Sequence, residues 1–198
     1  MTAFEEPEPL RIVAASLRAF DCSYPRYVEN PPPLGAILAV REGPCVVFGV
    51  VVNVESGPED PTRPLQPLGE PGQSAADVMR AHPHIRQLLR TRVRVVACGH
   101  ATDGGPVPLL PPLPPPLLAR VEPATPEETR ALTAGGRFLP LLLAASECDD
   151  AVIGAAIRTA RATFGDDGRS FLVEAGKELA RLLRAEPARL TTILRMAV

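Results

Sequence analysis

The sequence contains few aromatic residues and almost no lysine, and both shortages limit what the chain can recognise. It has no tryptophan, two tyrosines and six phenylalanines among 198 residues. Side chains on which bases could stack are therefore scarce, which disfavours stacking on single-stranded nucleic acid. Lys177 is the only lysine, and the other 20 basic residues are arginines. With a net charge of -2, the chain has no overall positive field to attract nucleic acid or an anionic membrane.

Common catalytic motifs are also missing. Lys177 follows Gly176 but precedes Glu178, and the upstream glycine of a phosphate-binding Walker loop is absent. Neither G-x-S-x-G nor G-x-G-x-x-G occurs. The paired aspartates Asp149-Asp150 and Asp166-Asp167 stand where a helix cap or a turn favours aspartate. We therefore predict that the protein is not an enzyme and has no catalytic residue and no cofactor.

The cysteines and the N-terminus indicate the compartment. Cys22, Cys45, Cys98 and Cys148 are widely spaced, without a C-x-x-C pair, so we expect free thiols in a reducing cytoplasm. The acidic N-terminus MTAFEEPEPL lacks the apolar core of a signal peptide. No run approaches the roughly 20 apolar residues of a membrane helix. We therefore expect a soluble cytoplasmic protein without a membrane partner.

The histidines could suggest a metal site together with one cysteine. His82, His84 and His100 are all the histidines of the chain, and Cys98 lies close to the third. A zinc site needs about four ligands that converge on one point. Pro83 separates the first two histidines, and no acidic residue is near in sequence. We therefore predict surface histidines, a buried thiol and no metal.

The most informative segment is Leu34–Gly57, in which two β-branched, apolar runs are joined by Arg41-Glu42-Gly43-Pro44. Such residues suit a pleated, buried surface, and Glu42-Gly43-Pro44 supplies a turn. A glycine inside the second run, Gly49, predicts a bulge or a sharp bend of the kind that closes a small sheet into a barrel. We assign structural roles in closure to three glycines and expect the run 46–54 to form core or subunit contacts. These glycines are Gly35, Gly49 and Gly57.

Further strands and short helices are expected on both sides of this segment. Leu10–Cys22 predicts the first strand, with an interruption near Ala14–Ser16. Ser74 is placed to cap a helix after the proline-rich stretch 58–74, and a second short helix is expected over His84–Arg90. The alternation of arginine and valine in 92–100 predicts a half-buried strand. A last strand is expected within 117–122.

Beyond Thr125 the pattern becomes helical. Thr125-Pro126 is typical of a helix start, and Gly135-Gly136 of a helix end. Three amphipathic helices follow, over 151–164 with Asp149 as cap, over 170–184, and from Pro187 onward. The expected fold class is α+β, with a small closed or nearly closed antiparallel β-barrel followed by a C-terminal bundle of short helices. The expected divisions are a flexible acidic N-terminus (1–8), a barrel with inserted short helices and proline-rich loops (9–128), and a helical domain (129–198).

A basic window is the leading candidate for nucleic-acid contact. No aspartate or glutamate occurs from Val78 through Thr102, although this stretch holds five arginines. On the predicted elements, Arg86 and Arg90 share a helix face, and Arg92 and Arg94 share a strand face. Such a surface could contact phosphates. Two alternatives are a solvated polar face and arginines that pair with acids elsewhere in the fold. The candidate residues of this Arg80–Arg94 window are Arg86, Arg90, Arg92 and Arg94.

The run LLPPLPPPLL at 109–118 has two interpretations. Polyproline segments dock onto aromatic grooves of partner domains. Equally, such a run can act as a stiff strap between the barrel and its last strand, since leucines flank the prolines.

Taken together, the strand pattern resembles the HAS barrel, the small N-terminal β-barrel of HerA-type DNA translocases, which is related to the N-terminal barrels of ATP synthase subunits. The resemblance covers about residues 9–128 and depends on hydrophobic pattern and glycine and proline placement. In that family a RecA-like motor follows the barrel, which helps to assemble the ring and to engage a nuclease. Here a helical tail of roughly 60 residues follows, too short for an ATPase core, so ATP hydrolysis is not carried over. The segments that carry the resemblance are LRIVAAS, LGAILAV, VVFGVVVNVESG, PHIRQLLRTRVRVVACGH, LLPPLPPPL and RVEPATPEE.

The resemblance implies a non-catalytic adaptor or assembly protein that docks on a HerA-like ATPase or its nuclease in DNA repair or processing. The alternative is a protein that binds DNA directly through the Arg80–Arg94 window. Homo-oligomerisation is also open, because leucines of the two last predicted helices form an apolar stripe that a second copy or the protein's own core could cover.

Overall fold

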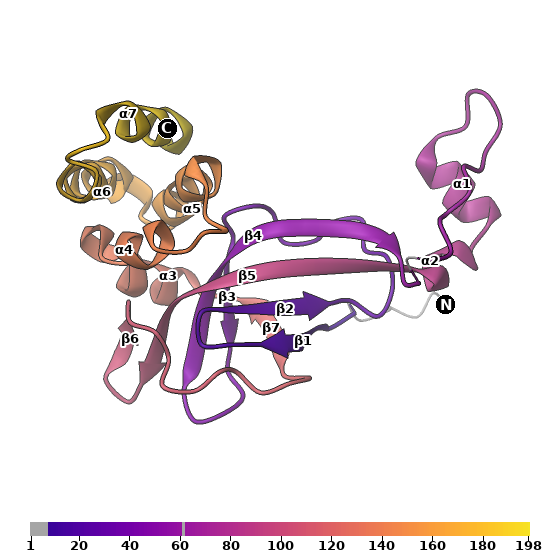
Figure 1. The fold of residues 1–198 in the computed structure, drawn as a ribbon, viewed down its shortest axis with the longest axis horizontal. Helices are drawn as coiled ribbons and strands as arrows, with labels where there is room; N and C mark the ends of the chain where they lie inside the picture. Colours follow the sequence, from indigo (N-terminus) through magenta and orange to yellow (C-terminus); the bar gives the residue numbers. More distant parts are fainter. Residues whose placement is uncertain (1–7, 61) are drawn as a thin grey trace.

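The protein, described here by a computed structural model, is built around one antiparallel β-sheet (Figure 1). The structure describes residues 8–60 and 62–198. The strands are β1 (Leu10–Ala15), β2 (Ala19–Ser23), β3 (Ile37–Val40), β4 (Val46–Pro58), β5 (Leu89–Thr102), β6 (Gly105–Val107) and β7 (Arg120–Pro123).

Six of these strands close into a barrel. The hydrogen-bonded order is β2-β1-β7-β3-β4-β5, and the first and last members of this series also pair with each other. Every pairing is antiparallel. β6 adds a short hairpin to the far end of β5. The closed barrel gives each of its strands two neighbours, and it confirms the predicted fold class.

The bulge predicted at Gly49 is confirmed. The pairing between β4 and β5 shifts register between Phe48 and Gly49. A Cβ atom at Gly49 would lie 2.4 Å from Cγ1 of Val95 and 3.2 Å from the ring of Phe20, both inside the barrel. The bare backbone at this position therefore makes room for two core side chains while the bulged strand bends.

The segment predicted as one interrupted strand is in fact a complete hairpin of β1 and β2. The turn contains neither glycine nor proline, so its strongest sequence signal is absent. Instead, the Ser16 hydroxyl oxygen accepts hydrogen bonds from the backbone N–H groups of Arg18 and Ala19, at 3.3 and 3.1 Å. A single serine thus replaces the usual turn residues.

The helices begin where the caps were predicted. Ser74 and Thr125 each form a capping box, and Asp149 accepts a hydrogen bond from the Val152 N–H at 2.9 Å. The second short helix is shorter than predicted and ends at Leu88. The helices are α1 (Ala75–Ala81), α2 (Ile85–Leu88), α3 (Pro126–Thr133), α4 (Leu139–Leu143), α5 (Asp150–Thr163), α6 (Gly168–Leu182) and α7 (Pro187–Ala197), with 3-10 turns η1 (Ala134–Gly136) and η2 (Gly165–Asp167).

The molecule has two hydrophobic cores. One fills the barrel and includes Phe20, Val51 and Val95. The second lies between the outer face of β3, β4 and β5 and the C-terminal helices, where Phe48 and Leu132 belong to the same cluster. Helices α3, α4 and α5 lie against this side of the sheet, and α6 and α7 pack on them from outside (Figure 1). The predicted division at 128/129 falls inside α3.

Gly35 lies where helix and barrel meet most closely. Its φ is +79°, and a Cβ atom there would lie 2.4 Å from the carbonyl carbon of Ala155 and 2.6 Å from the nitrogen of Ala156, both in α5. This glycine thus lets the backbone of α5 approach the start of β3. Gly57 has open space around its Cα, so no close contact requires glycine there.

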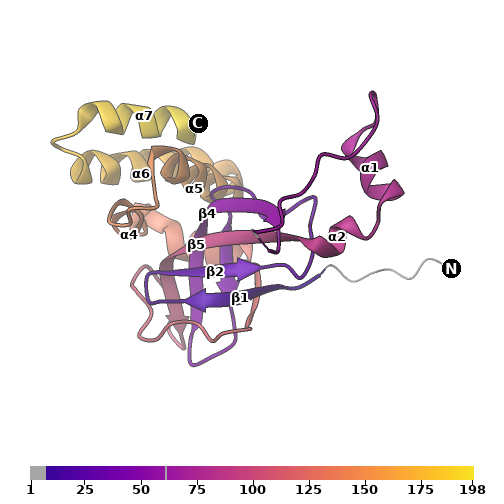
Figure 2. The ribbon, with the colours of Figure 1, turned by 45° about the vertical axis from the view of Figure 1, so that its right-hand side comes forward.

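β4 and β5 form a long ribbon that carries an arm. The two strands pair from Val46 opposite Ala101 to Pro58 opposite Leu89. Beyond this end, the irregular stretch after β4 together with α1 and α2 projects away from the barrel (Figure 2). No residue of α1 is buried.

Two predictions from the sequence concern the flexible N-terminus and the absence of a membrane-spanning helix. Residues 1–7 of the N-terminus predicted as flexible lie outside the described residues. Within the part of the chain that the structure describes, no helix is both long and apolar enough to cross a membrane.

Candidate functional site

The wall of the barrel formed by β1, β2 and the first half of β5 carries the arginines of interest. Along β5, buried residues alternate with outward ones, so Arg90, Arg92 and Arg94 all face away from the barrel interior. The predicted common face of Arg92 and Arg94 is therefore confirmed. The C-terminal helices leave the outer side of Arg11 and Arg92 exposed, and at the far end of this wall Arg94 contacts Glu147, just after α4. Figure 2 shows β1 and β2 in front of the barrel.

A groove of about 470 Å³ lies on this wall. It brings together two of the predicted residues, Arg90 and Arg92, and adds Arg11 from β1. Sequence reasoning missed Arg11, because about 80 residues separate it from the basic window and only strand pairing places it nearby. The lining residues are Pro9, Arg11, Val13, Ser23, Tyr24, Pro25, Glu59, Arg90 and Arg92.

Three arginines and one glutamate set the charge of this groove. Nη2 of Arg90 lies 2.7 Å from Oε2 of Glu59. Arg92 donates only to the backbone carbonyl of Glu59, at 3.4 Å, and Arg11 donates to the backbone carbonyl of Leu118, at 2.8 Å. Among residues 8–60 and 62–198, neither of these two guanidinium groups is ion-paired with a carboxylate. The groove therefore carries an excess of positive charge.

Arg94 is neutralised by two acids. Its Nη1 and Nη2 atoms donate to Asp21 at 2.8 Å and to Glu147 at 3.0 Å. The hydrogen bond with Glu147 is the main cause that raises the pKa of Arg94, and the same bond lowers the pKa of Glu147. This arginine ties the barrel wall to the segment that follows α4, which is a structural role.

Arg86 is also paired, and it lies on a different element from Arg90. Its Nη2 atom is 2.7 Å from Glu29, and Arg80, in the same window, is 2.9 Å from Asp77. The predicted helix face shared by Arg86 and Arg90 is wrong, because α2 ends at Leu88 and Arg90 belongs to β5. The four predicted residues do not form one patch.

A second feature is the segment 107–118, which we call the leucine strap. Pro111 and Pro115 are buried against the barrel, whereas the leucines between and after them point outward. No charged residue occurs from 104 to 119. The strap therefore exposes several apolar side chains and no charged group. Its exposed leucines are Leu109 (62%), Leu113 (56%), Leu117 (63%) and Leu118 (66%).

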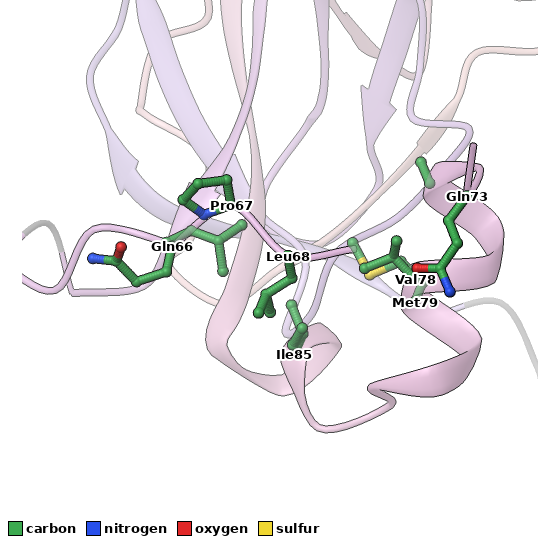
Figure 3. A pocket seen from close by; sticks show the side chains of 9 residues that line it. Gln66, Pro67, Leu68, Gln73, Val78, Met79 and Ile85 are labelled. Atoms are coloured by element: carbon green, nitrogen blue, oxygen red, sulfur yellow. The ribbon is translucent and has the colours of Figure 1, made fainter. Parts of the chain in front are cut away.

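The arm contains a separate apolar pocket of about 360 Å³ (Figure 3). Leu68, Val78 and Met79 face it together with Ile85. Its polar contributions come from Gln66 and Gln73. None of the nine residues that line it has a titratable or nucleophilic side chain, so the pocket offers no acid–base chemistry.

The histidines and Cys98 do not converge. His82 and His84 stand on the arm with ring centroids 5.9 Å apart, whereas His100 lies near the opposite end of β5 and contacts the Leu109 carbonyl through Nδ1 at 3.0 Å. Cys98 is fully buried. In residues 8–60 and 62–198, no three His, Cys, Asp or Glu side chains gather as metal ligands would.

We expect the four thiols of the folded protein to resist modification by DTNB at pH 8. All four cysteines are free and buried. Burial, with added repulsion from neighbouring carboxylates, raises the pKa of Cys22 and of Cys148 to about 12, and burial also raises the pKa of Cys98. The reactive thiolate is therefore scarce. Four thiols should react in guanidinium chloride and almost none in buffer, and fast stoichiometric reaction of the folded protein would contradict this burial.

Comparison with known proteins assigns no relative. No protein-family model matches the sequence, and no curated protein matches it significantly. The HAS-barrel family therefore stays a prediction from resemblance, whereas the barrel itself follows from the strand pairing.

Proposed function

We propose that the protein is a non-catalytic adaptor or assembly factor that presents the leucine strap to a protein partner. The observation that carries this proposal is the uncharged run from 104 to 119, with four leucines more than half exposed. Contiguous exposed apolar surface of this kind is typical of interaction sites. A proline-rich strap also loses little conformational entropy on binding, because it is already stiff in the free protein.

The backbone at Leu118 supports this proposal. Leu118 has φ of +65° and is the only residue other than glycine with a positive φ among residues 8–60 and 62–198. A left-handed conformation costs such a residue about 1–2 kcal/mol. Two hydrogen bonds hold it, from its N–H to the Ile12 carbonyl at 2.9 Å and from Arg11 to its own carbonyl. A strained backbone that keeps a leucine in solvent favours a role in recognition.

The partner that fits this surface is a protein with an apolar, aromatic-lined groove. The resemblance to the HAS barrel suggests a HerA-like ring ATPase or its associated nuclease, in DNA repair or processing. Recognition through the strap requires no catalytic group on this chain.

Strap leucines should be hot spots for this binding. Replacing both Leu113 and Leu117 with serine is expected to weaken binding at least 10-fold, because each leucine would lose burial in the partner's groove. Both side chains are exposed in the free protein, so its thermal unfolding midpoint should stay nearly unchanged. Isothermal titration calorimetry with the purified HerA-like ATPase and nuclease of the same organism measures the effect.

A matched control is Val173→Ser, which alters another apolar residue that is more than half exposed (52%), on α6 and outside the strap. It should bind like the unmodified protein. Equal affinity of the strap variant and the unmodified protein would rule out the strap as the binding surface. Absence of binding to both candidate proteins would rule out the suggested partners.

A further inference from the structure

Strand pairing places Arg11, Ser23 and Arg92 in one row across three neighbouring strands. Arg11 of β1 is directly opposite Ser23 of β2, and Ser23 is directly opposite Arg92 of β5. Adjacent strands lie about 4.8 Å apart, so the two arginine backbones are separated by roughly 10 Å. All three residues face outward, since the flanking Ile12, Cys22 and Val93 fill the barrel.

The short serine between two long side chains leaves a hollow, and this hollow belongs to the groove already described. The Ser23 hydroxyl donates to the Tyr24 carbonyl at 3.0 Å and so stays low on the wall. Arg11 and Arg92 line the groove on the two sides of Ser23, and in the free protein their guanidinium groups donate to the carbonyls of Leu118 and Glu59. A ligand above Ser23 would be contacted by one guanidinium group from each side once these two side chains exchange their backbone carbonyl partners for the ligand.

The charges around the row favour an anion. Glu59, the acid that lines the groove, is held by Arg90 at 2.7 Å. Glu55 stands opposite Arg92 on β4 without forming an ion pair. Elsewhere on this wall Arg94 is neutralised by two carboxylates. Among residues 8–60 and 62–198, Arg11 and Arg92 are therefore the arginines of this wall that form no ion pair.

We propose that the row of Arg11, Ser23 and Arg92, which we call the arginine cradle, binds a backbone phosphate of a nucleic-acid strand. A planar guanidinium fork fits phosphate oxygens with two parallel hydrogen bonds. A tetrahedral phosphate offers oxygens to both sides at once, so it can bridge two forks that approach from opposite directions. The groove lies on the outer wall of the barrel, which suits a long strand that passes across the protein.

This inference goes beyond the adaptor function and does not depend on it. It uses Arg92 from the basic window, leaves out Arg86, Arg90 and Arg94, which are ion-paired, and adds Arg11 as the residue that completes the site. Phosphate contacts carry little sequence information, so binding should show weak sequence preference.

The test measures fluorescence anisotropy of a fluorescein-labelled 20-nucleotide single strand and of a 20-base-pair duplex at 50, 100 and 200 mM NaCl. The double variant Arg11→Gln/Arg92→Gln is compared with the unmodified protein. We expect affinity at 50 mM NaCl to fall about 10-fold and the slope of log K against log salt to shrink by about 1, because both arginines contact the same phosphate.

The matched control is Arg41→Gln/Arg86→Gln, which removes the same number of positive charges. Both of these arginines are ion-paired, with Glu128 and Glu29 respectively. Its affinity should stay within about twofold of the unmodified protein, apart from the general effect of net charge. Equal losses in the two double variants would overturn the cradle, as would the absence of salt-dependent binding by the unmodified protein at 50 mM NaCl.

Three further measurements separate loss of phosphate binding from loss of folding, from binding of free phosphate and from the role of the strap. Should the double variant unfold at lower temperature, Arg92→Gln alone is measured, because Arg92 makes only one backbone hydrogen bond, at 3.4 Å. Its affinity should fall, by less than that of the double variant, since Arg11 still contacts the phosphate. Inorganic phosphate that raises the unfolding midpoint while neither oligonucleotide binds would overturn the nucleic-acid assignment in favour of a free phosphate. Leu113→Ser should leave oligonucleotide binding unchanged, which separates the cradle from the strap.

Discussion

Replacing Gly35 by alanine is expected to lower the free energy of unfolding by about 3 kcal/mol, because two separate costs add at this position. The residue has φ of +79°, and a left-handed alanine costs about 1–2 kcal/mol. The new methyl group would also lie 2.4 Å from the carbonyl carbon of Ala155. The backbone of α5 cannot move aside as a flexible side chain would, and overpacking of this kind costs about 1–3 kcal/mol.

Urea denaturation followed by circular dichroism measures this loss. Gly57→Ala is the matched control, because its Cβ meets no atom within 4 Å and its φ is not positive. That variant should be neutral or slightly stabilising, since alanine restricts the unfolded chain. A Gly35→Ala protein as stable as the Gly57→Ala protein would show that α5 does not pack against this turn.

Replacing Leu132 by alanine should cost about 3 kcal/mol, in the range measured for leucine truncations in well-packed cores. Leu132 is fully buried in α3 and belongs to the cluster that joins the helices to the outer face of the barrel. Its Cδ1 atom lies only 2.4 Å from where a Cβ of Gly99 would be, so it packs directly on the backbone of β5. Truncation would leave a cavity at the junction of the two parts.

Two probes should follow this loss together. Circular dichroism at 222 nm reports mainly on the helices, and tyrosine fluorescence reports on the barrel end of the chain, where Tyr24 and Tyr27 lie. If the shared core makes one cooperative unit, both transitions shift to the same lower urea concentration. Val173→Ala, at an exposed site on α6, should change little. A loss below 1 kcal/mol for Leu132→Ala would argue against tight docking of α3.

The features that could be predicted from sequence are those that short-range chemistry decides. The caps at Ser74, Thr125 and Asp149 depend on a side chain and a backbone amide three residues apart, so their residue types are sufficient. The bulge at Gly49 was similarly visible as a glycine inside a β-branched run. The hairpin between β1 and β2 gives no such local signal, because Ser16 makes the turn where glycine or proline is usual.

The candidate site was predictable only in part, because it depends on long-range pairing. Local charge indicates Arg90 and Arg92, but Arg11 comes near them only because β1, β2 and β5 pair side by side in the closed barrel. Arg86 is neutralised by Glu29, and Arg94 is neutralised by Asp21 and Glu147. These acids lie 53 to 73 residues away from their arginines in the sequence. The absence of nearby acids in the window therefore did not mean unpaired arginines.

The length of the β4–β5 ribbon has a consequence for assembly. A strand of fourteen residues such as β5 spans at most about 45 Å, with the α1 arm near one extremity and the C-terminal helices near the other. Two small proteins bound at the two ends of the ribbon would not collide. The ribbon would then act as a spacer that sets the distance between them.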